Sequence, residues 1–457
     1  MADARRFFAP LAWVQGRWAR DVLLVAGAHG FWQEVREDCP ATDRAGAEVL
    51  RGPVLPGVVN AHSHAFQRAI AGGTEHGAAG HDDFWSWRER MYGAALRITP
   101  PQLEAIAAFL YGELLAAGYT HVCEFHYVQN DRDGQPYADP LEMSLALVRA
   151  AQQAGIGLTL LPTLYMRSGF GARCLRKEQR RFASTPESVL RIAQAVRTLA
   201  VGSPRITAGI ALHSLRAVDE GALAECAAAA GAAGMPLHIH VAEQQQEVDD
   251  CLAHHGCRPV EWLLRNASLD AHWNLVHATH ANASELQALQ RTGAAIVLCP
   301  STEANLGDGV FDLPAWLAAG GAWSIGSDSH VTRSWSEELR LLEYSQRLVL
   351  RRRNVAAHAS GTESSACALL QGALGGASAA AGLPAGGLAS GQRADFCIPD
   401  MTTPAFAGVA GDFLLDALVF SSPGAPMQRT VVAGEDVRRE LPTAGYVQAI
   451  RQLGSGA

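Results

Sequence analysis

The sequence lacks both the long apolar run of a membrane span and the basic clusters of a nucleic-acid-binding protein. No stretch of about 18 apolar residues occurs. The short apolar segment near the N-terminus is interrupted by Pro10 and Gln15, so we expect no signal peptide either. The net charge is -8, and the longest run of basic residues is Arg351–Arg353. Binding to nucleic acids or to anionic membranes is therefore not expected.

Cysteine occurs without any paired spacing. The nine cysteines are scattered along the chain, their number is odd, and none forms a Cys-x-x-Cys motif. A disulfide framework is therefore not expected. Reduced thiols and the missing signal peptide together predict a cytoplasmic protein.

Lysine is almost absent, since Lys177 is the only one in the chain. Hydrophobic residues make up 48% and charged residues 18% of the 457 positions, which allows a large core and argues against disorder. The length suits one large barrel with a smaller partner domain.

Short apolar runs alternate with Ala/Leu-rich amphipathic segments through most of the chain. We expect helices at segments such as 101–117, 140–154, 186–200 and 221–233, and strands at residues 54–60, 120–125, 157–164, 206–212, 236–241, 274–278, 294–299 and 322–326. Strands that alternate with helices indicate parallel βαβ units. Eight such units favour a closed (β/α)8 TIM-like barrel over the competing doubly wound open sheet.

The two ends of the chain differ from the middle. Residues 20–25 and 394–399 are short strand-like pieces among Gly, Pro and Asp, and neither end looks able to fold alone. We expect residues 1–53 and 386–457 to pair into one small β-sandwich domain beside a barrel of residues 54–385. The Ala/Gly-rich stretch 375–391 then leads out of the barrel.

Polar side chains end four of the eight predicted strands. His62 and His64 follow the first strand, and a His-x-His pair on a strand points to one side. His240, His277 and Asp328 end the fifth, sixth and eighth strands. For any one strand, a hydrogen-bonded core His or a helix-capping Asp is an equally good explanation. Four such ends on one rim of a barrel instead favour a metal site, because histidines with one carboxylate suit Zn²⁺ and leave a position for water.

These residues resemble the amidohydrolase superfamily over the whole barrel, and the stretch 387–400 resembles the return strand that follows the barrel in those hydrolases. The resemblance implies a set of metal ligands, His62, His64, His240 and Asp328, and a set of catalytic residues, Glu243, His277 and Asp328. The position of Glu243, three residues after His240, also suits a proton shuttle that need not bind the metal.

The scarcity of lysine bears on the number of metal ions. Binuclear members of the superfamily usually need a carboxylated lysine, typically in the fourth strand. The segment 205–214 has none, and Lys177 lies in the loop before it. We therefore expect one Zn²⁺ ion per chain.

The loops around the predicted mouth resemble, from about His62 to Arg353, the branch of the superfamily that hydrolyses N-formimino-L-glutamate to N-formyl-L-glutamate and ammonia in histidine degradation. The resemblance implies a homodimer, and it implies substrate-binding residues, Arg88, Tyr127 and Arg216 at the carboxylates and Gln67 and His213 near the glutamate and formimino groups. Arginine forks do suit a dicarboxylate. The simpler explanation for Arg88 is a surface helix with an ion pair to Glu89.

Three alternatives stay open at this point. A relative acting on another formimino or guanidino acid, such as the aspartate analogue, differs by one methylene, which is worth only about 1–3 kcal/mol. A deaminase of a ring amidine usually needs an aromatic stacking pocket and no dicarboxylate clamp. A barrel without chemistry, serving as a scaffold, typically lacks metal ligands, whereas every expected ligand is present here.

Overall fold

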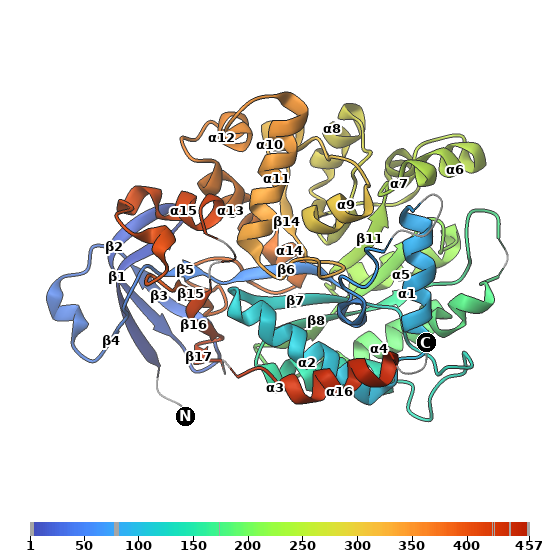
Figure 1. Cartoon of the computed structure of the whole chain (residues 1–457), viewed down its shortest axis with the longest axis horizontal. Coiled ribbons are helices and arrows are strands. Elements are labelled where there is room, and N and C mark those ends of the chain that lie inside the picture. Colours follow the sequence, from blue (N-terminus) through green and yellow to red (C-terminus); the bar gives the residue numbers. More distant parts are fainter. Residues whose placement is uncertain are drawn as a thin grey trace.

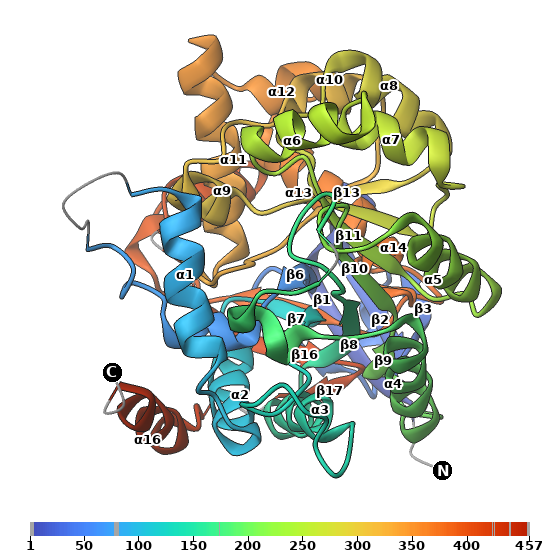
Figure 2. The same ribbon diagram turned by 90° about the vertical axis from the view of Figure 1, so that its right-hand side faces the viewer.

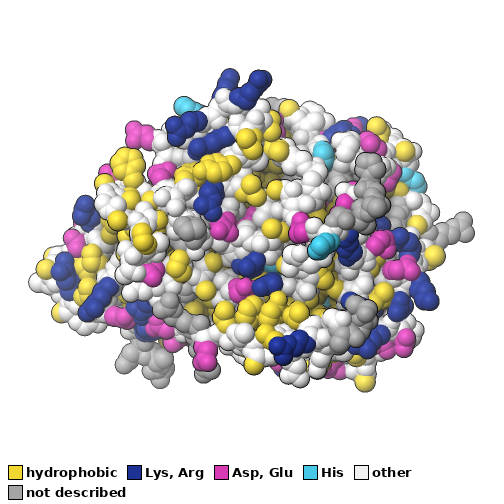
Figure 3. Space-filling model, in the orientation of Figure 1, with side chains coloured by type: hydrophobic (Ala, Val, Ile, Leu, Met, Phe, Trp, Pro, Cys, Tyr) yellow, Lys and Arg dark blue, Asp and Glu magenta, His cyan; other side chains and the backbone are white. Residues whose placement is uncertain are grey.

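The computed structural model describes residues 4–76, 82–172, 174–422, 424, 426–437 and 440–454. In this part of the chain, a barrel of parallel strands wrapped by helices lies beside a smaller β region that carries the N-terminal strands (Figure 1). Basic and acidic side chains are interspersed over the face shown in Figure 3, with hydrophobic ones between them. No helix in the described part is long and apolar enough to cross a membrane.

The barrel is closed and parallel. Neighbouring strands pair in order around it, β14 pairs with β6, and β10 pairs with both β8 and β11, so no edge remains open. The predicted barrel is confirmed and the open doubly wound sheet is excluded. Its strands are β6 (Val58–Ser63), β7 (Tyr119–His126), β8 (Gly157–Leu164), β9 (Ile206–Ala208) with β10 (Ile210–Ser214), β11 (Leu237–Val241), β12 (Trp273–His277), β13 (Ala295–Leu298) and β14 (Trp323–Ile325).

The fourth position of the barrel is shared by β9 and β10, which are separated by Gly209. A side chain at Gly209 would overlap the carbonyl oxygen of Pro236, the residue that precedes β11. A glycine is needed where two backbones approach this closely. The break turns the strand so that β10 can pair with β8 as well as with β11.

Helices surround the strands (Figure 2). The segments that begin or end them carry the expected signals: Thr185 caps the start of α4 with its side chain, Pro186 follows it, and Gly155 ends α3 with a φ of 84°. The helices that follow or precede the barrel strands are α1 (Phe84–Ala95), α2 (Pro100–Ala116), α3 (Glu142–Ala154), α4 (Pro186–Leu199), α5 (Glu220–Ala232), α6 (Gln245–His255), α7 (Pro259–Asn266), α8 (Ala283–Thr292), α9 (Pro300–Leu306), α10 (Leu313–Ala318), α11 (Trp335–Leu350), α12 (Val355–Ser360) and α13 (Ser365–Gly375).

A short helix, α14 (Ala377–Ala381), contacts the interior of the barrel on the side away from the strand-end histidines. Its last carbonyl oxygens accept hydrogen bonds from interior side chains: Ala380 from Nε2 of His238 at 3.0 Å, and Ala381 from Oγ1 of Thr159 at 2.7 Å. His238 therefore has a structural partner, although it lies two residues before the strand-end His240. The helix thus supplies hydrogen-bond acceptors to these two buried side chains of the barrel.

Two four-stranded sheets lie beside the barrel. Residues from both share one buried core, in which the ring of Phe7 meets the rings of Trp32 and Phe396 at centroid distances of 6.4 and 5.2 Å. Apolar contact between the sheets thus joins residues from both ends of the chain. The first sheet contains β1 (Arg5–Val14), β2 (Arg17–Ala26), β3 (Trp32–Arg36) and β4 (Glu48–Val49), and the second β5 (Leu55–Pro56), β15 (Phe396–Pro399), β16 (Met427–Val432) and β17 (Glu435–Asp436).

Helices also occur around β15 and β16: one separates these two strands, and another follows the short strand β17. Between them, α15 (Leu414–Phe420) packs on α11 and α13. After them, α16 (Thr443–Gly454) lies along α2 of the barrel, where the ring of Tyr446 stacks on Phe109 with centroids 4.2 Å apart (Figure 1). The C-terminal segment therefore covers the barrel as well as the small sheets.

A buried ion pair connects the second sheet to the barrel. Arg393 is hydrogen-bonded through Nε to Asp395, through Nη1 to His121 and through Nη2 to the carbonyl of Thr120. We expect Arg393→Ala to lower the free energy of unfolding by about 3–5 kcal/mol, because the change leaves Asp395 buried and unpaired.

Urea denaturation of the two proteins measures this loss. The matched control is Arg265→Ala, since Arg265 pairs with Glu261 on the surface of α7 and an exposed pair contributes about 0–1 kcal/mol. A loss in Arg393→Ala no larger than that of the control would contradict the assignment.

Candidate active site

Four predicted ligands meet at the carboxyl ends of the barrel strands. His62 and His64 come from the end of β6, His240 from β11 and Asp328 from the turn after β14. Nε2 of His62 lies 3.1 Å from Nε2 of His64 and 3.0 Å from Nε2 of His240. Oδ1 of Asp328 lies 3.5 Å from Nε2 of both His62 and His64. The structure thus brings three imidazoles and a carboxylate oxygen to one point.

In His64 and His240, the hydrogen bond made by Nδ1 shows that Nε2 is the nitrogen free to bind a metal ion. Nδ1 of His64 lies 2.9 Å from the carbonyl oxygen of Phe125, and Nδ1 of His240 lies 2.9 Å from that of His213. A carbonyl can only accept, so both Nδ1 atoms carry the proton and both Nε2 atoms present lone pairs to the centre. Burial lowers the pKa of His64 to about 3, with His277 adding to the effect. Neutral rings with converging lone pairs fit a divalent metal ion.

The His-x-His segment is held by a carboxylate that sequence analysis did not single out. Glu124, on β7, accepts hydrogen bonds from Oγ of Ser63 at 2.7 Å, from the backbone N–H of Ala65 at 2.6 Å and from the hydroxyl of Tyr111 at 3.1 Å. Burial raises the pKa of Glu124 to about 7. These bonds fix the backbone on both sides of His64.

Two predicted catalytic residues stand next to the ligands. Nε2 of His277 lies 3.7 Å from Oε1 of Glu243 and 3.7 Å from Oδ2 of Asp328. Burial disfavours the charged form of His277, but Glu243, Glu303 and Asp328 outweigh it and raise its pKa to about 10. Burial raises the pKa of Asp328 to about 7, against the effect of His277. Acid and base groups thus lie within reach of each other.

The backbone at these residues is strained. His277 and Asp328 have φ values of 69° and 47°, in the left-handed region that L-residues seldom adopt. Strain of this kind is typical of functional sites and needs support from the surrounding structure. Part of this support comes from the parallel bridge between Ser63 and Asp328, which closes the barrel at this point.

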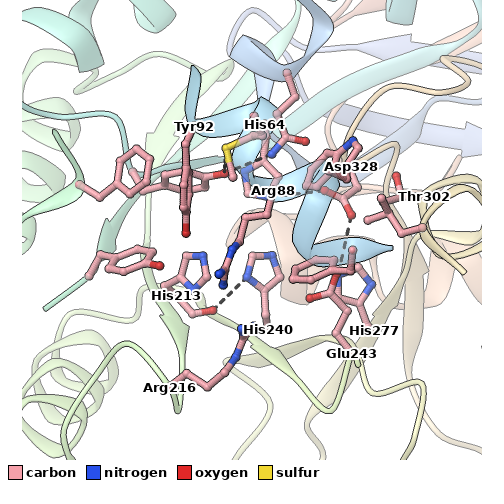
Figure 4. A pocket seen from close by; sticks show the side chains of 18 residues that line it. His64, Arg88, Tyr92, His213, Arg216, His240, Glu243, His277, Thr302 and Asp328 are labelled. Carbon is pink, nitrogen blue, oxygen red and sulfur yellow. Dashed lines mark hydrogen bonds and ion pairs between the residues drawn. The ribbon is translucent and has the colours of Figure 1, made fainter. Parts of the chain in front are cut away.

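A cavity with about 560 Å³ of empty volume opens beside this cluster (Figure 4). Arg88 of α1 and Arg216, just after β10, point into it from opposite sides. The ring of Trp85 lies 4.4 Å from the guanidinium of Arg88 and 5.6 Å from that of Arg216. Burial lowers the pKa of Arg88, and the neighbouring Arg216 adds to this. Two cations held this close favour an anionic ligand between them.

Neither arginine is fully paired within the described residues. The Nε atoms of Arg88 and Arg216 are buried without a hydrogen-bond partner. The nearest carboxylates are 3.9 Å away, at Glu89 for Arg88 and at the buried Glu247 for Arg216. Arg88 faces the cavity and is not the surface residue that the simpler explanation required.

The other predicted substrate-binding residues also line the cavity. Gln67, in η2 (Ala65–Ala69), donates to the hydroxyl of Tyr127 at 3.1 Å, and its Oε1 is buried without a partner. His213, on β10, packs on the ring of Tyr165 with centroids 4.3 Å apart. Burial lowers the pKa of His213 well below its usual value, and Arg216 and His64 contribute, so its ring is neutral.

Several functional positions could not be predicted as such from the sequence. Trp85 lies between the arginines, and Tyr92 and Tyr165 share a hydrogen-bonded Gln179 at 3.0 and 2.9 Å. Nothing in their local sequence separates them from core aromatics. Glu303 did carry a signal, since it follows the seventh strand by a few residues, where barrel active sites lie.

Glu303, on α9, contacts the ring of His277, which is predicted to be catalytic. Its Oε1 lies 3.2 Å from Nδ1 of His277 and accepts the backbone N–H of Cys299 at 2.8 Å. We expect Glu303→Gln to lower kcat by about 10- to 100-fold, the effect typical of partners that orient a metal-site residue. KM stays within about twofold, because Glu303 is not in the cavity lining.

Steady-state kinetics measure both constants, and Glu303→Asp is the control. If Glu303→Asp, which keeps the charge but shortens the side chain, lowers kcat as much as Glu303→Gln does, Glu303 acts by positioning the ring of His277. An equal rise of KM and fall of kcat in both variants would instead indicate a general disturbance of the cavity.

The fold and the site together define a metal-dependent hydrolase built on a parallel barrel. Within that class, residues 54–437 match the amidohydrolase family, and the chain belongs to this family. The interpretation of the strand-end residues as an amidohydrolase pattern is thereby confirmed.

Individual relatives are similar over almost their whole length. The chain is 47% identical over 444 residues to the formimidoylglutamate deiminase of Pseudomonas aeruginosa, which covers 97% of each chain. A crystal structure of an amidohydrolase from Brucella melitensis has a TM-score of 0.91 and 41% identity, covering 98% of this chain and 99% of that one. The 5-methylthioadenosine/S-adenosylhomocysteine deaminase of Halobacterium salinarum is 26% identical over 412 residues, 90% of this chain and 87% of that protein.

Proposed function

We propose that this protein hydrolyses N-formimino-L-glutamate to N-formyl-L-glutamate and ammonia, as a step of histidine degradation. The observation that carries the proposal is the pair of incompletely paired arginines, Arg88 and Arg216, in the cavity that also contains Glu243, His277 and Asp328. The 47% identity to a formimidoylglutamate deiminase over 97% of both chains supports the same substrate.

The metal we propose is one Zn²⁺ ion, held by His62, His64, His240 and Asp328. The support is the donor set itself, three imidazoles with one carboxylate, which is typical of zinc and leaves an open position. When bound, such an ion supplies Lewis acidity and lowers the pKa of a water molecule to about 7.

The residues of the chain then move the protons. Asp328 or Glu243 takes a proton from the attacking water as its oxygen adds to the formimino carbon. Glu243 delivers one proton to the imino nitrogen, and the second proton of the water passes from the new hydroxyl, through Asp328 or Glu243, to the same nitrogen. The carbon–oxygen double bond then forms as the carbon–nitrogen bond breaks, and the nitrogen leaves as ammonia. His277, held by Glu303, stabilises the negative charge that develops on oxygen. One water is consumed, and the formyl oxygen derives from it.

The remaining cavity residues hold the substrate. Arg88, Tyr127 and Arg216 bind the two carboxylates, with charge-assisted contacts worth about 1.5–3 kcal/mol each. Gln67 uses its free Oε1 for a substrate N–H, and the neutral His213 lies near the formimino group. The neighbouring rings exclude water from the reacting carbon.

The direct test is ammonia release from N-formimino-L-glutamate by the zinc-loaded protein, with N-formylglutamate identified as the second product. Release of both in equal amounts supports the proposal. A protein that contains one zinc ion and releases nothing keeps the metal site but excludes this substrate, and N-formimino-L-aspartate and ring amidines are the next candidates.

The organisation of the chain completes the proposal. We propose that residues 1–53 and 386–457 build a small β-sandwich domain beside the barrel of residues 54–385, and that β5 (Leu55–Pro56) of the barrel segment adds a short strand to it. The core that the two sheets share around Phe7 and Phe396 supports this. We also propose a homodimer, for which the exposed Leu348 and Val349 of α11 offer apolar surface. The nine unpaired cysteines suit a cytoplasmic location.

A further inference from the structure

A second group of metal-binding side chains lies against the first. His277, Cys299 and Asp328 each offer one ligand atom, and these atoms all lie within 4.8 Å of one another. His277 ends β12, Cys299 follows β13 and Asp328 lies after β14, so three adjacent strands supply them. All three side chains are buried. No proposed step of the reaction uses the thiol of Cys299.

The carboxylate of Asp328 faces both groups. Its Oδ1 lies 3.5 Å from Nε2 of His62 and of His64, whereas its Oδ2 lies 3.7 Å from Nε2 of His277. One oxygen can therefore bind an ion on each side, as bridging carboxylates do in two-metal sites. Oε1 of Glu243 lies 3.7 Å from the same Nε2 of His277 and adds a fourth donor.

The chemistry of these donors selects the kind of ion. Nδ1 of His277 is engaged with Glu303, so Nε2 is the nitrogen that binds a metal ion. A thiolate with an imidazole and carboxylates suits Zn²⁺ and Cd²⁺, whereas Mg²⁺ and Ca²⁺ prefer oxygen ligands alone. Binding displaces the thiol proton of Cys299 and the Nε2 proton of His277, and both are released to solvent.

We propose that His277, Cys299 and Asp328, with Glu243, form a second site for a soft divalent ion, and that its occupation inhibits the enzyme. The inhibition rests on the proposed function, because an ion there takes Glu243 and His277 out of proton transfer. The site does not involve the strand-four lysine of binuclear relatives, and Cys299 takes part only when the second ion is bound. Activity then falls as free zinc rises above what the first site needs.

The experiment titrates Cd²⁺ into the protein already loaded with one zinc ion per chain. Metal content after gel filtration, the ultraviolet thiolate-to-cadmium absorption and residual activity are measured together. We expect one additional ion per chain, an absorption increase from one thiolate and loss of activity in parallel. The first two readouts need no substrate, so they stand even if N-formimino-L-glutamate proves not to be the substrate.

Two variants at Cys299 assign the ligand. Cys299→Ser and Cys299→Ala are expected to keep their activity without added Cd²⁺, to lack the absorption increase and to need about tenfold or more Cd²⁺ for half inhibition, since even an outer partner of a metal site is worth that much. Cys174→Ser removes an exposed thiol and serves as the matched control. The proposal is overturned if the zinc-loaded protein takes up no second ion. It is equally overturned if both Cys299 variants bind Cd²⁺ and lose activity as the unchanged protein does.

Discussion

Glu243→Gln is expected to lower turnover by about 100- to 10,000-fold, the contribution of a positioned acid–base group. The amide keeps the size of the side chain but cannot deliver a proton to the leaving nitrogen. Its zinc content should stay at the wild-type level, because Glu243 lies beside His277 and outside the set of three imidazoles around His62.

Ammonia release and zinc content are measured on the same preparation. Glu225→Gln, a change on the exposed side of α5, is the control and should leave both unchanged. Loss of zinc in Glu243→Gln would make this residue a ligand and contradict the mechanism. Full activity with full zinc content would contradict it as well.

Arg216→Ala is expected to lower kcat/KM for N-formimino-L-glutamate by about 10- to 150-fold, which corresponds to the 1.5–3 kcal/mol of a charge-assisted hydrogen bond. The change removes a buried cation from the cavity and leaves the buried Glu247 without its nearest arginine. Most of the loss should fall on KM, because the carboxylates are bound equally before and during the reaction.

A substrate with one carboxylate turns this into a double-mutant cycle. N-formimino-4-aminobutyrate lacks the α-carboxylate. If Arg216 binds that group, the wild-type protein and Arg216→Ala should have nearly the same kcat/KM for this compound. The same comparison with Arg88→Ala assigns the other carboxylate. Undiminished kcat/KM in both variants would exclude the dicarboxylate clamp and favour a ring amidine as substrate.

The barrel was predictable because its signals are local. Each strand is a short apolar run, many helices begin at a side-chain cap or a proline, and the order of strands and helices determines the fold. The second barrel strand, expected at 120–125, is Tyr119–His126, and the strand expected at 157–164 is Gly157–Leu164. Most boundaries differ by a residue or two, because terminal turns depend on packing. The first barrel strand, expected at 54–60, is instead Val58–Ser63, since Leu55–Pro56 pair with β15 of the second small sheet.

The N-terminal strands were harder to predict. Pro10 in an apolar run discourages a strand, yet β1 runs from Arg5 to Val14. The ladder pairs Ala9 with Val22 and Leu11 with Arg20, and Asp21, opposite the proline, has a φ of 47°. A local irregularity in the partner strand thus accommodates the proline, and the sequence of β1 alone does not contain that information.

The candidate site also contains residues that the sequence could predict and residues that it could not. The proposed metal ligands could be predicted because they lie at strand ends, which the barrel brings together on one rim. Glu124 looked like part of a strand, and Glu303 like part of a helix, since their roles depend on which residue of another element they meet. The position of Glu303 just after the seventh strand indicated the active-site rim, but its contact with His277, like the contacts of Glu124, is determined by tertiary structure.

The shared core of the two small sheets affects how the chain can fold during synthesis. Phe7 and Trp32 leave the ribosome before the barrel does, whereas Phe396, which covers them, follows more than three hundred residues later. Until then the apolar face of the N-terminal hairpin has no partner, although the barrel strands between the two segments can already pair. Long-range closure of this kind slows folding and exposes surface that aggregates. We therefore expect premature termination before β15 to yield insoluble chains that depend on chaperones, even though every proposed catalytic residue has been made.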